Sequence, residues 1–159
     1  MKYQDELEIG ALAQYAAWLN ARAKAVGAQG RLDAARLRDR IFESAGRCEW
    51  CDADLVGIDF ELDHIVSLKQ GGGNTPGNLR VACASCNRRK AGKSPMQFAA
   101  EIFSELGIKT KLVAMLMETG DVDAGRQMAM FDDAATAAND SSIDIEDGLS
   151  SACQYNWTN

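Results

Sequence analysis

Two Cys-x-x-Cys pairs constrain this chain more than any other feature of its sequence. The two-residue gap lets both sulfurs of a pair face one ion, and two such pairs complete the ligand set of a tetrahedral zinc site. A segment this small, with a glycine-rich centre, buries little apolar surface, so metal binding would supply much of its folding free energy. We therefore predict structural zinc, rather than two disulfides, at Cys48, Cys51, Cys83 and Cys86.

Between the two pairs, the sequence places an acid beside the only histidine of the chain. The segment contains, in order, CEWC, DHI, GGGN, NL and CASCNRRKAGK. This ordered set resembles the HNH endonuclease family, the ββα-metal finger of phage, restriction and homing nucleases. The resemblance covers Arg47 to Pro95 and not the flanks, and it implies a strand, a loop and a helix around a metal site.

The resemblance implies a role for each polar residue of the segment. His64 matches the general base, because an imidazole that titrates near neutrality can take a proton from water. Asp63 matches the metal-binding acid, and Asn87 stands where many members have a second histidine. Asn78 matches the asparagine that braces the histidine loop, with Asn74 as the competing choice. The chain is thus expected to be a His-Asn-Asn variant of the family.

Asp63 and Asn87 are both expected to bind the catalytic ion through oxygen. Oxygen ligands favour Mg²⁺ or Mn²⁺ over Zn²⁺ or Ni²⁺. Neighbouring residues of a regular strand point to opposite faces, so Asp63 and His64 share a site only if the backbone departs from strand geometry there. The alternatives are an acid that caps a turn and a structural histidine.

Basic residues follow the second cysteine pair. Beside a nuclease site, we expect them to contact phosphates without reading bases, although a solvated basic face is the alternative. The residues expected to bind nucleic acid are Arg88, Arg89, Lys90 and Lys93. Glu61 and Lys69 are left open as contacts of the metal ligands or of the substrate.

The net charge of −6 over 159 residues is unusual for a nucleic-acid-binding protein. The charge is unevenly distributed, because residues 118–159 hold nine acids and one base, whereas residues 1–117 hold 16 bases and 14 acids. The polar, acidic N-terminus and the absence of a long apolar run predict a cytoplasmic protein without a membrane segment. Cys153 is left outside the pairs as an idle thiol.

Helical spacing of apolar residues predicts helices over 4–27, 31–44, 95–106 and 109–120, with a further turn or two over 123–131. Alternation over 58–63 predicts a strand with Ile58, Phe60 and Leu62 inward. A helix is expected to begin at Cys86, and Ser94 is expected to cap the helix that follows it.

We therefore predict an α+β fold, in which a zinc-stabilised ββα finger is flanked by helices and followed by a disordered acidic tail. The predicted parts are an N-terminal helical region over 1–44, the nuclease module over 45–95, C-terminal helices over 96–131, and the tail over 132–159.

The leading functional hypothesis is a metal-dependent endonuclease that nicks or cuts DNA with little sequence preference. The alternative is a non-catalytic zinc module that docks on nucleic acid or protein. Because residues 1–117 hold only two more bases than acids and the whole chain carries −6, its DNA affinity is expected to come from a larger protein partner or a homo-oligomer. The resemblance suggests the setting of a phage, mobile-element or anti-phage defence complex, and the acidic tail is expected to restrain the enzyme.

Overall fold

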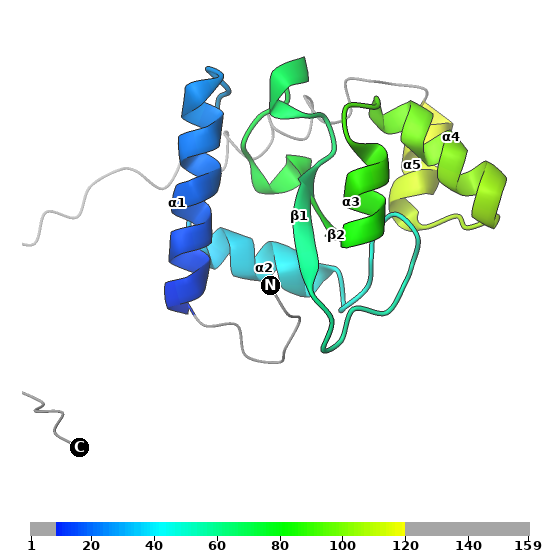
Figure 1. Ribbon diagram of the computed structural model, residues 1–159, viewed down its shortest axis with the longest axis horizontal. Helices are drawn as coiled ribbons and strands as arrows, with labels where there is room; N and C mark the ends of the chain where they lie inside the picture. The colour runs from blue at the N-terminus through cyan, green and yellow to red at the C-terminus, as the bar shows by residue number, and fades with distance from the viewer. Residues whose placement is uncertain (1–8, 120–159) are drawn as a thin grey trace, which may run out of the picture.

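The computed structural model describes residues 9–119, and the fold is α+β as predicted (Figure 1). The predicted turn over 123–131, the tail over 132–159 and Cys153 lie outside the described residues. No helix within residues 9–119 is long and apolar enough to cross a membrane. The helices and strands are α1 (Ile9–Ala25), α2 (Ala34–Glu43), β1 (Phe60–His64), β2 (Leu79–Cys83), α3 (Ala84–Lys90), α4 (Pro95–Leu106) and α5 (Lys111–Thr119), with short 3-10 turns at Leu68–Gln70 and Pro76–Asn78.

The two N-terminal helices form because their apolar residues recur on one face and their ends are capped. In α1, the buried positions are Leu12, Ala16, Leu19 and Ala23, spaced as one stripe of a helix. Asp33 begins α2 by accepting a hydrogen bond from the backbone N–H of Arg36 at 2.8 Å. The arrangement places α1 and α2 on one side of the strands and α3, α4 and α5 on the other (Figure 1).

The strands β1 and β2 form an antiparallel pair that places Asp63 opposite Arg80 and His64 opposite Leu79. The strand begins at Phe60, and Ile58 is 55% exposed, so the prediction that Ile58 points inward is wrong. The backbone N–H of Ile58 instead donates to the carbonyl of Leu55 in a turn. The alternation of apolar and acidic residues in the sequence therefore begins before the strand does.

The helix α3 begins at Ala84, two residues before the predicted start at Cys86. The thiol sulfur of Cys83 caps it by accepting a hydrogen bond from the backbone N–H of Cys86. By contrast, the start of α4 agrees with the prediction, since Ser94 and Gln97 form a reciprocal capping box.

One hydrophobic cluster includes residues from the strands and from the helices on both sides of them. Trp50, fully buried in the first cysteine knuckle, packs edge-on against Phe98 of α4 with ring centroids 5.0 Å apart. Leu19 of α1 and Leu116 of α5 belong to the same cluster. The finger is thus packed against its flanking helices, which fix the position of the strand that carries His64.

Candidate functional site

The four cysteines of the two pairs lie close enough to hold one metal ion. Their sulfur atoms are all within 4.8 Å of one another, and the sulfurs of Cys51 and Cys83 are 3.9 Å apart. A Zn–S bond of about 2.3 Å gives a tetrahedron with edges of about 3.8 Å, so this spacing fits zinc. The cysteines are free thiols, not disulfides. This cluster, Cys48, Cys51, Cys83 and Cys86, is positioned to bind a metal.

Proton sharing among these thiols also points to a metal. A hydrogen bond from the Cys86 thiol lowers the pKa of Cys48 to about 5, and the same bond raises the pKa of Cys86. Burial raises the pKa of Cys51 to about 11. Without a cation, the negative charge of one thiolate opposes ionisation of the neighbouring thiols. A bound divalent ion offsets that charge and allows several of the thiols to ionise together.

Asn78 closes the loop that follows His64. Its fully buried side chain accepts a hydrogen bond from the N–H of Val66 at 2.9 Å and donates to the carbonyls of Val66 and Gly73, at 2.9 and 2.8 Å. Gly72 is required here, because a Cβ atom at this position would lie 1.9 Å from the carbonyl oxygen of Val66. Asn78 thus makes the bracing contacts expected of it, while Asn74 contacts His64 itself.

His64 ends β1 with its ring mostly buried and its Nε2 atom 3.1 Å from Oδ1 of Asn74. Burial lowers the pKa of His64 to about 4, and the positive charges of Arg22 and Lys90 act in the same direction. The imidazole is therefore neutral at neutral pH. Its Nδ1 atom makes no hydrogen bond within residues 9–119 and is not completely buried among them.

Asp63 points away from His64, as strand geometry requires. Its carboxylate accepts hydrogen bonds from Nε1 of Trp50 and Nζ of Lys90, both at 3.1 Å, and only 8% of the residue is exposed. Lys90 also donates to the backbone carbonyl of His64 at 2.7 Å. Burial raises the pKa of Asp63, while Lys90 and Trp50 oppose that change. Asp63 is thus held inside the protein by Trp50 and Lys90.

The structure brings Asn87 to Glu61 instead. The side-chain amide of Asn87 donates a hydrogen bond to the carboxylate of Glu61, and both residues are partly exposed at the same groove. Within residues 9–119, no hydrogen bond joins Asp63 to Asn87, since Asp63 contacts Trp50 and Lys90 whereas Asn87 contacts Glu61. A carboxylate and an amide at a solvent-open groove do fit a hard divalent cation.

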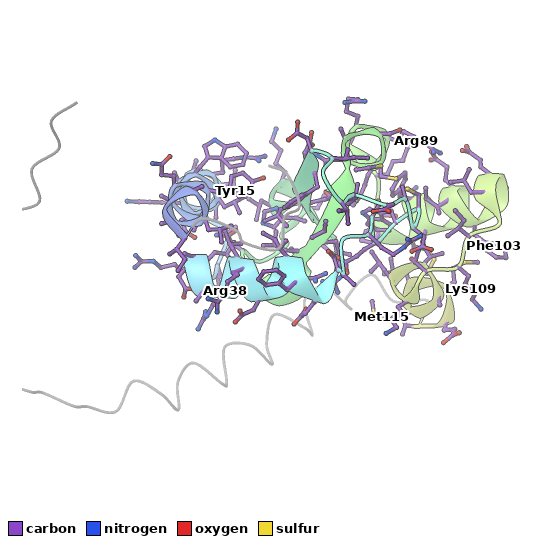
Figure 2. The ribbon with its side chains drawn as sticks, turned by 90° about the horizontal axis from the view of Figure 1, so that it is seen from below. Tyr15, Arg38, Arg89, Phe103, Lys109 and Met115 are labelled. Carbon is purple, nitrogen blue, oxygen red and sulfur yellow. The ribbon has the colours of Figure 1, made fainter. Side chains whose placement is uncertain are left out.

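The groove runs between α1 and the free edge of β1 and has a volume of about 580 Å³. Its α1 wall carries Trp18, which stacks on Tyr15 with centroids 5.5 Å apart and has the guanidinium of Arg22 4.6 Å from its ring (Tyr15 is labelled in Figure 2). Arg22 makes no ion pair within the described part of the chain. This wall is not among the sites predicted from the sequence, although the spacing of Tyr15, Trp18 and Arg22 places them on one helix face.

The basic residues of the finger differ in how much charge they offer to a ligand. Arg88 is exposed and has no ion pair within residues 9–119. Arg89 pairs with Glu101 and Glu105 of α4, and Lys93 pairs with Glu101. Lys90 is 1% exposed and paired with Asp63, so the expectation that it contacts phosphate disagrees with the structure.

The basic residues of α2 do not extend this surface. Arg38 of α2 and Arg89 of α3 lie on opposite sides of the molecule (Figure 2). Arg40 is 5% exposed and donates to the carbonyl of Leu79 at 2.8 Å while it pairs with Glu49. Among the basic residues that follow the second cysteine pair and those of the groove wall, the exposed or half-exposed ones are therefore Arg88, Arg89 and Lys93 of the finger and Arg22 of α1.

The paired strands, the helix α3 and the cysteine cluster define a ββα finger with a tetrathiolate metal site. The family model described as HNH endonuclease matches residues 48–93, so this segment is similar to an HNH endonuclease domain. A comparison with curated proteins finds no match. The match supports a nuclease-type function in general, acting on nucleic acid.

Proposed function

We propose that the protein is a metal-dependent endonuclease that hydrolyses DNA phosphodiester bonds, nicking or cutting with little sequence preference. The observation that carries this proposal is a neutral His64 whose Nδ1 atom makes no hydrogen bond within residues 9–119, at the end of the strand that also carries Glu61. A neutral imidazole can take a proton from an attacking water. A binding module would have no need of a histidine held in this way.

Each residue of the proposed site then has a task, with Glu61 and Asn87 in the groove and His64 and Asn78 at the end of β1 beyond it. Nδ1 of His64 accepts the proton of the water, and Asn78 holds the loop so that the ring keeps its position. Glu61 and Asn87 would hold Mg²⁺ or Mn²⁺, in place of the pair Asp63 and Asn87 named from the sequence. Such an ion, when bound, polarises the phosphate and stabilises the charge that develops on the leaving oxygen.

Phosphates of the DNA are proposed to contact Arg22 and Arg88, which lack ion pairs within residues 9–119. Arg22 lines the groove, and its charge already acts on His64. Arg89 and Lys93 would contribute after exchange of their glutamate partners for phosphate, and Lys69 is exposed near the end of the histidine loop. These contacts position the backbone and make binding depend on salt concentration.

Substitution Glu61→Gln tests the assignment of the ion ligands. Glutamine can still accept the hydrogen bond from Asn87, so the fold is expected to persist while the anionic ligand is lost. In the zinc-loaded protein, we expect Mn²⁺ affinity, measured by electron paramagnetic resonance, to fall by about tenfold or more, with a matching loss of plasmid cleavage at fixed Mn²⁺.

The control is Glu43→Gln, which removes the same charge from an exposed position of α2 and is expected to leave Mn²⁺ binding unchanged. Unchanged Mn²⁺ affinity in Glu61→Gln, together with its loss in Asp63→Asn, would return the ion to Asp63. Failure of every form to cleave DNA, despite intact folding and Mn²⁺ binding, would favour the binding-module alternative.

We further propose that the chain works in the cytoplasm with a larger protein partner or as a homo-oligomer, in a phage, mobile-element or anti-phage defence complex. The support is electrostatic, because much of the positive charge of the finger is paired internally and the chain as a whole carries −6. The acidic residues 132–159 are proposed to compete with DNA for the remaining cations.

A further inference from the structure

A chain of side-chain amides joins the backbone that follows α1 to the imidazole of His64. It runs from Leu32 through Asn20 and Asn74, and each link is 2.8 to 3.1 Å long. Asn20 lies on α1, outside the residues that match the HNH endonuclease family model. The direction of each hydrogen bond in this chain follows from the one before it.

The backbone of Leu32 fixes the orientation of the Asn20 amide. Its N–H donates to Oδ1 of Asn20 at 2.9 Å, and its carbonyl accepts from Nδ2 of Asn20 at 2.8 Å. A backbone N–H can only donate and a carbonyl can only accept, so a flipped amide would face two mismatched partners. Oδ1 of Asn20 is therefore an acceptor for Asn74 as well.

The Asn20 amide in turn fixes Asn74. Nδ2 of Asn74 donates to Oδ1 of Asn20 at 2.8 Å, and this leaves Oδ1 of Asn74 facing Nε2 of His64 at 3.1 Å. The flipped amide would bring two oxygen acceptors together. Because Oδ1 can only accept, Nε2 of the neutral imidazole must carry the proton, and Nδ1 keeps its lone pair.

The position of Asn74 leaves it no alternative partner. The residue is fully buried, and its backbone N–H donates to the carbonyl of Gln29 at 2.6 Å. Gly30 packs so closely that a Cβ atom there would lie 2.8 Å from the carbonyl oxygen of Asn74. The segment between α1 and α2 thus holds the backbone of Asn74, while Asn20 orients its side chain.

We propose that Asn20, acting through Asn74, is a positioning residue that keeps His64 in the Nε2–H tautomer, with Nδ1 as the proton-accepting atom. The expected effect on DNA cleavage rests on the proposed nuclease function, whereas the assignment of the tautomer does not. It gives the N-terminal helix a role in the chemistry of the finger.

The tautomer can be read directly, because the chain has one histidine. In the zinc-loaded, ¹⁵N-labelled full chain at neutral pH, without added Mn²⁺ or DNA, a long-range ¹H–¹⁵N correlation spectrum reports both ring nitrogens. We expect Nε2 at a protonated position and Nδ1 at an unprotonated one. The reverse assignment in the wild type would overturn the proposal without any variant.

Two substitutions of the same residue separate positioning from general stability. Asn20→Asp loses the hydrogen bond to the Leu32 carbonyl but keeps an oxygen that accepts from the Leu32 N–H and from Asn74, so it is expected to preserve the tautomer. Asn20→Ala removes the acceptor, so the Asn74 amide can turn, and the Nδ1 resonance is expected to move toward the average of the two forms. A spectrum of Asn20→Ala identical to that of the wild type would exclude a role for Asn20.

Cleavage rates then connect the tautomer to function. In Asn20→Ala we expect kcat to fall about tenfold with KM unchanged, less than the roughly 10²–10⁴-fold contribution of a general base, and Asn20→Asp should restore it. If the wild type shows the expected tautomer but does not cleave DNA, the tautomer assignment stands and the nuclease proposal fails. If the wild type cleaves DNA with the opposite tautomer, the tautomer assignment fails and the nuclease proposal stands.

Discussion

A Cys83→Ser variant is expected to lose its bound zinc and to unfold over the finger. Serine can still cap α3, because its hydroxyl can accept from the N–H of Cys86, but it does not replace a thiolate as a zinc ligand. Structural zinc contributes about 10–16 kcal/mol in zinc-finger peptides, against a total stability of about 5–15 kcal/mol for an ordinary domain. The loss should therefore abolish cooperative folding of the strands and of the helices packed on them.

Zinc content of the purified protein, together with thermal unfolding followed by circular dichroism, measures this effect. The control is Cys153→Ser, which removes the thiol outside the cluster and should leave zinc content and melting temperature unchanged. A Cys83→Ser protein that retains the wild-type melting temperature without zinc would show that the apolar core alone holds the finger together.

A Lys90→Met variant is expected to be less stable by about 3–5 kcal/mol, because it leaves the buried Asp63 carboxylate without its cation. It also removes the hydrogen bond to the backbone carbonyl of His64, which holds the end of β1. Chemical denaturation measures the free energy of unfolding, and the double variant Lys90→Met/Asp63→Asn should recover part of the loss, since asparagine still accepts from Trp50.

Arg88→Met is the matched control, since it removes a cation from the same helix at an exposed position. We expect its stability to change by less than about 0.5 kcal/mol, while its DNA affinity falls. If Lys90→Met were as stable as the wild type and weaker only in DNA binding, Lys90 would be the phosphate contact expected from the sequence.

The zinc cluster and most of the helices could be predicted because their signals are local. Two Cys-x-x-Cys pairs require only that the chain bring them together, and Ser94 before Pro95 predicts a helix start from neighbouring residues alone. Asn78 is also predictable, because it braces the same loop that its motif defines. In each case the residues that interact lie in one short segment of the sequence or follow a recognisable repeated motif.

The contact between Asn87 and Glu61 and the burial of Lys90 were not predictable from local signals. Asn87 of α3 contacts Glu61 and Lys90 of the same helix contacts Asp63, and these contacts depend on how α3 packs on β1. Lys90 ends a basic run that reads as a surface feature, yet the last turn of α3 directs it inward to Asp63. Asn20 lies outside the motif altogether, and only the tertiary packing of α1 brings it to Asn74.

The most direct test of the central claim compares wild type with His64→Ala on supercoiled plasmid, with Mg²⁺ and with Mn²⁺, after both proteins are shown to be folded and zinc-loaded. The proposed mechanism predicts that the wild type produces nicked or linear DNA only with an added divalent ion, and that His64→Ala is slower by about 10²–10⁴-fold. Equal cleavage by the two proteins would contradict the assignment of His64 as the general base.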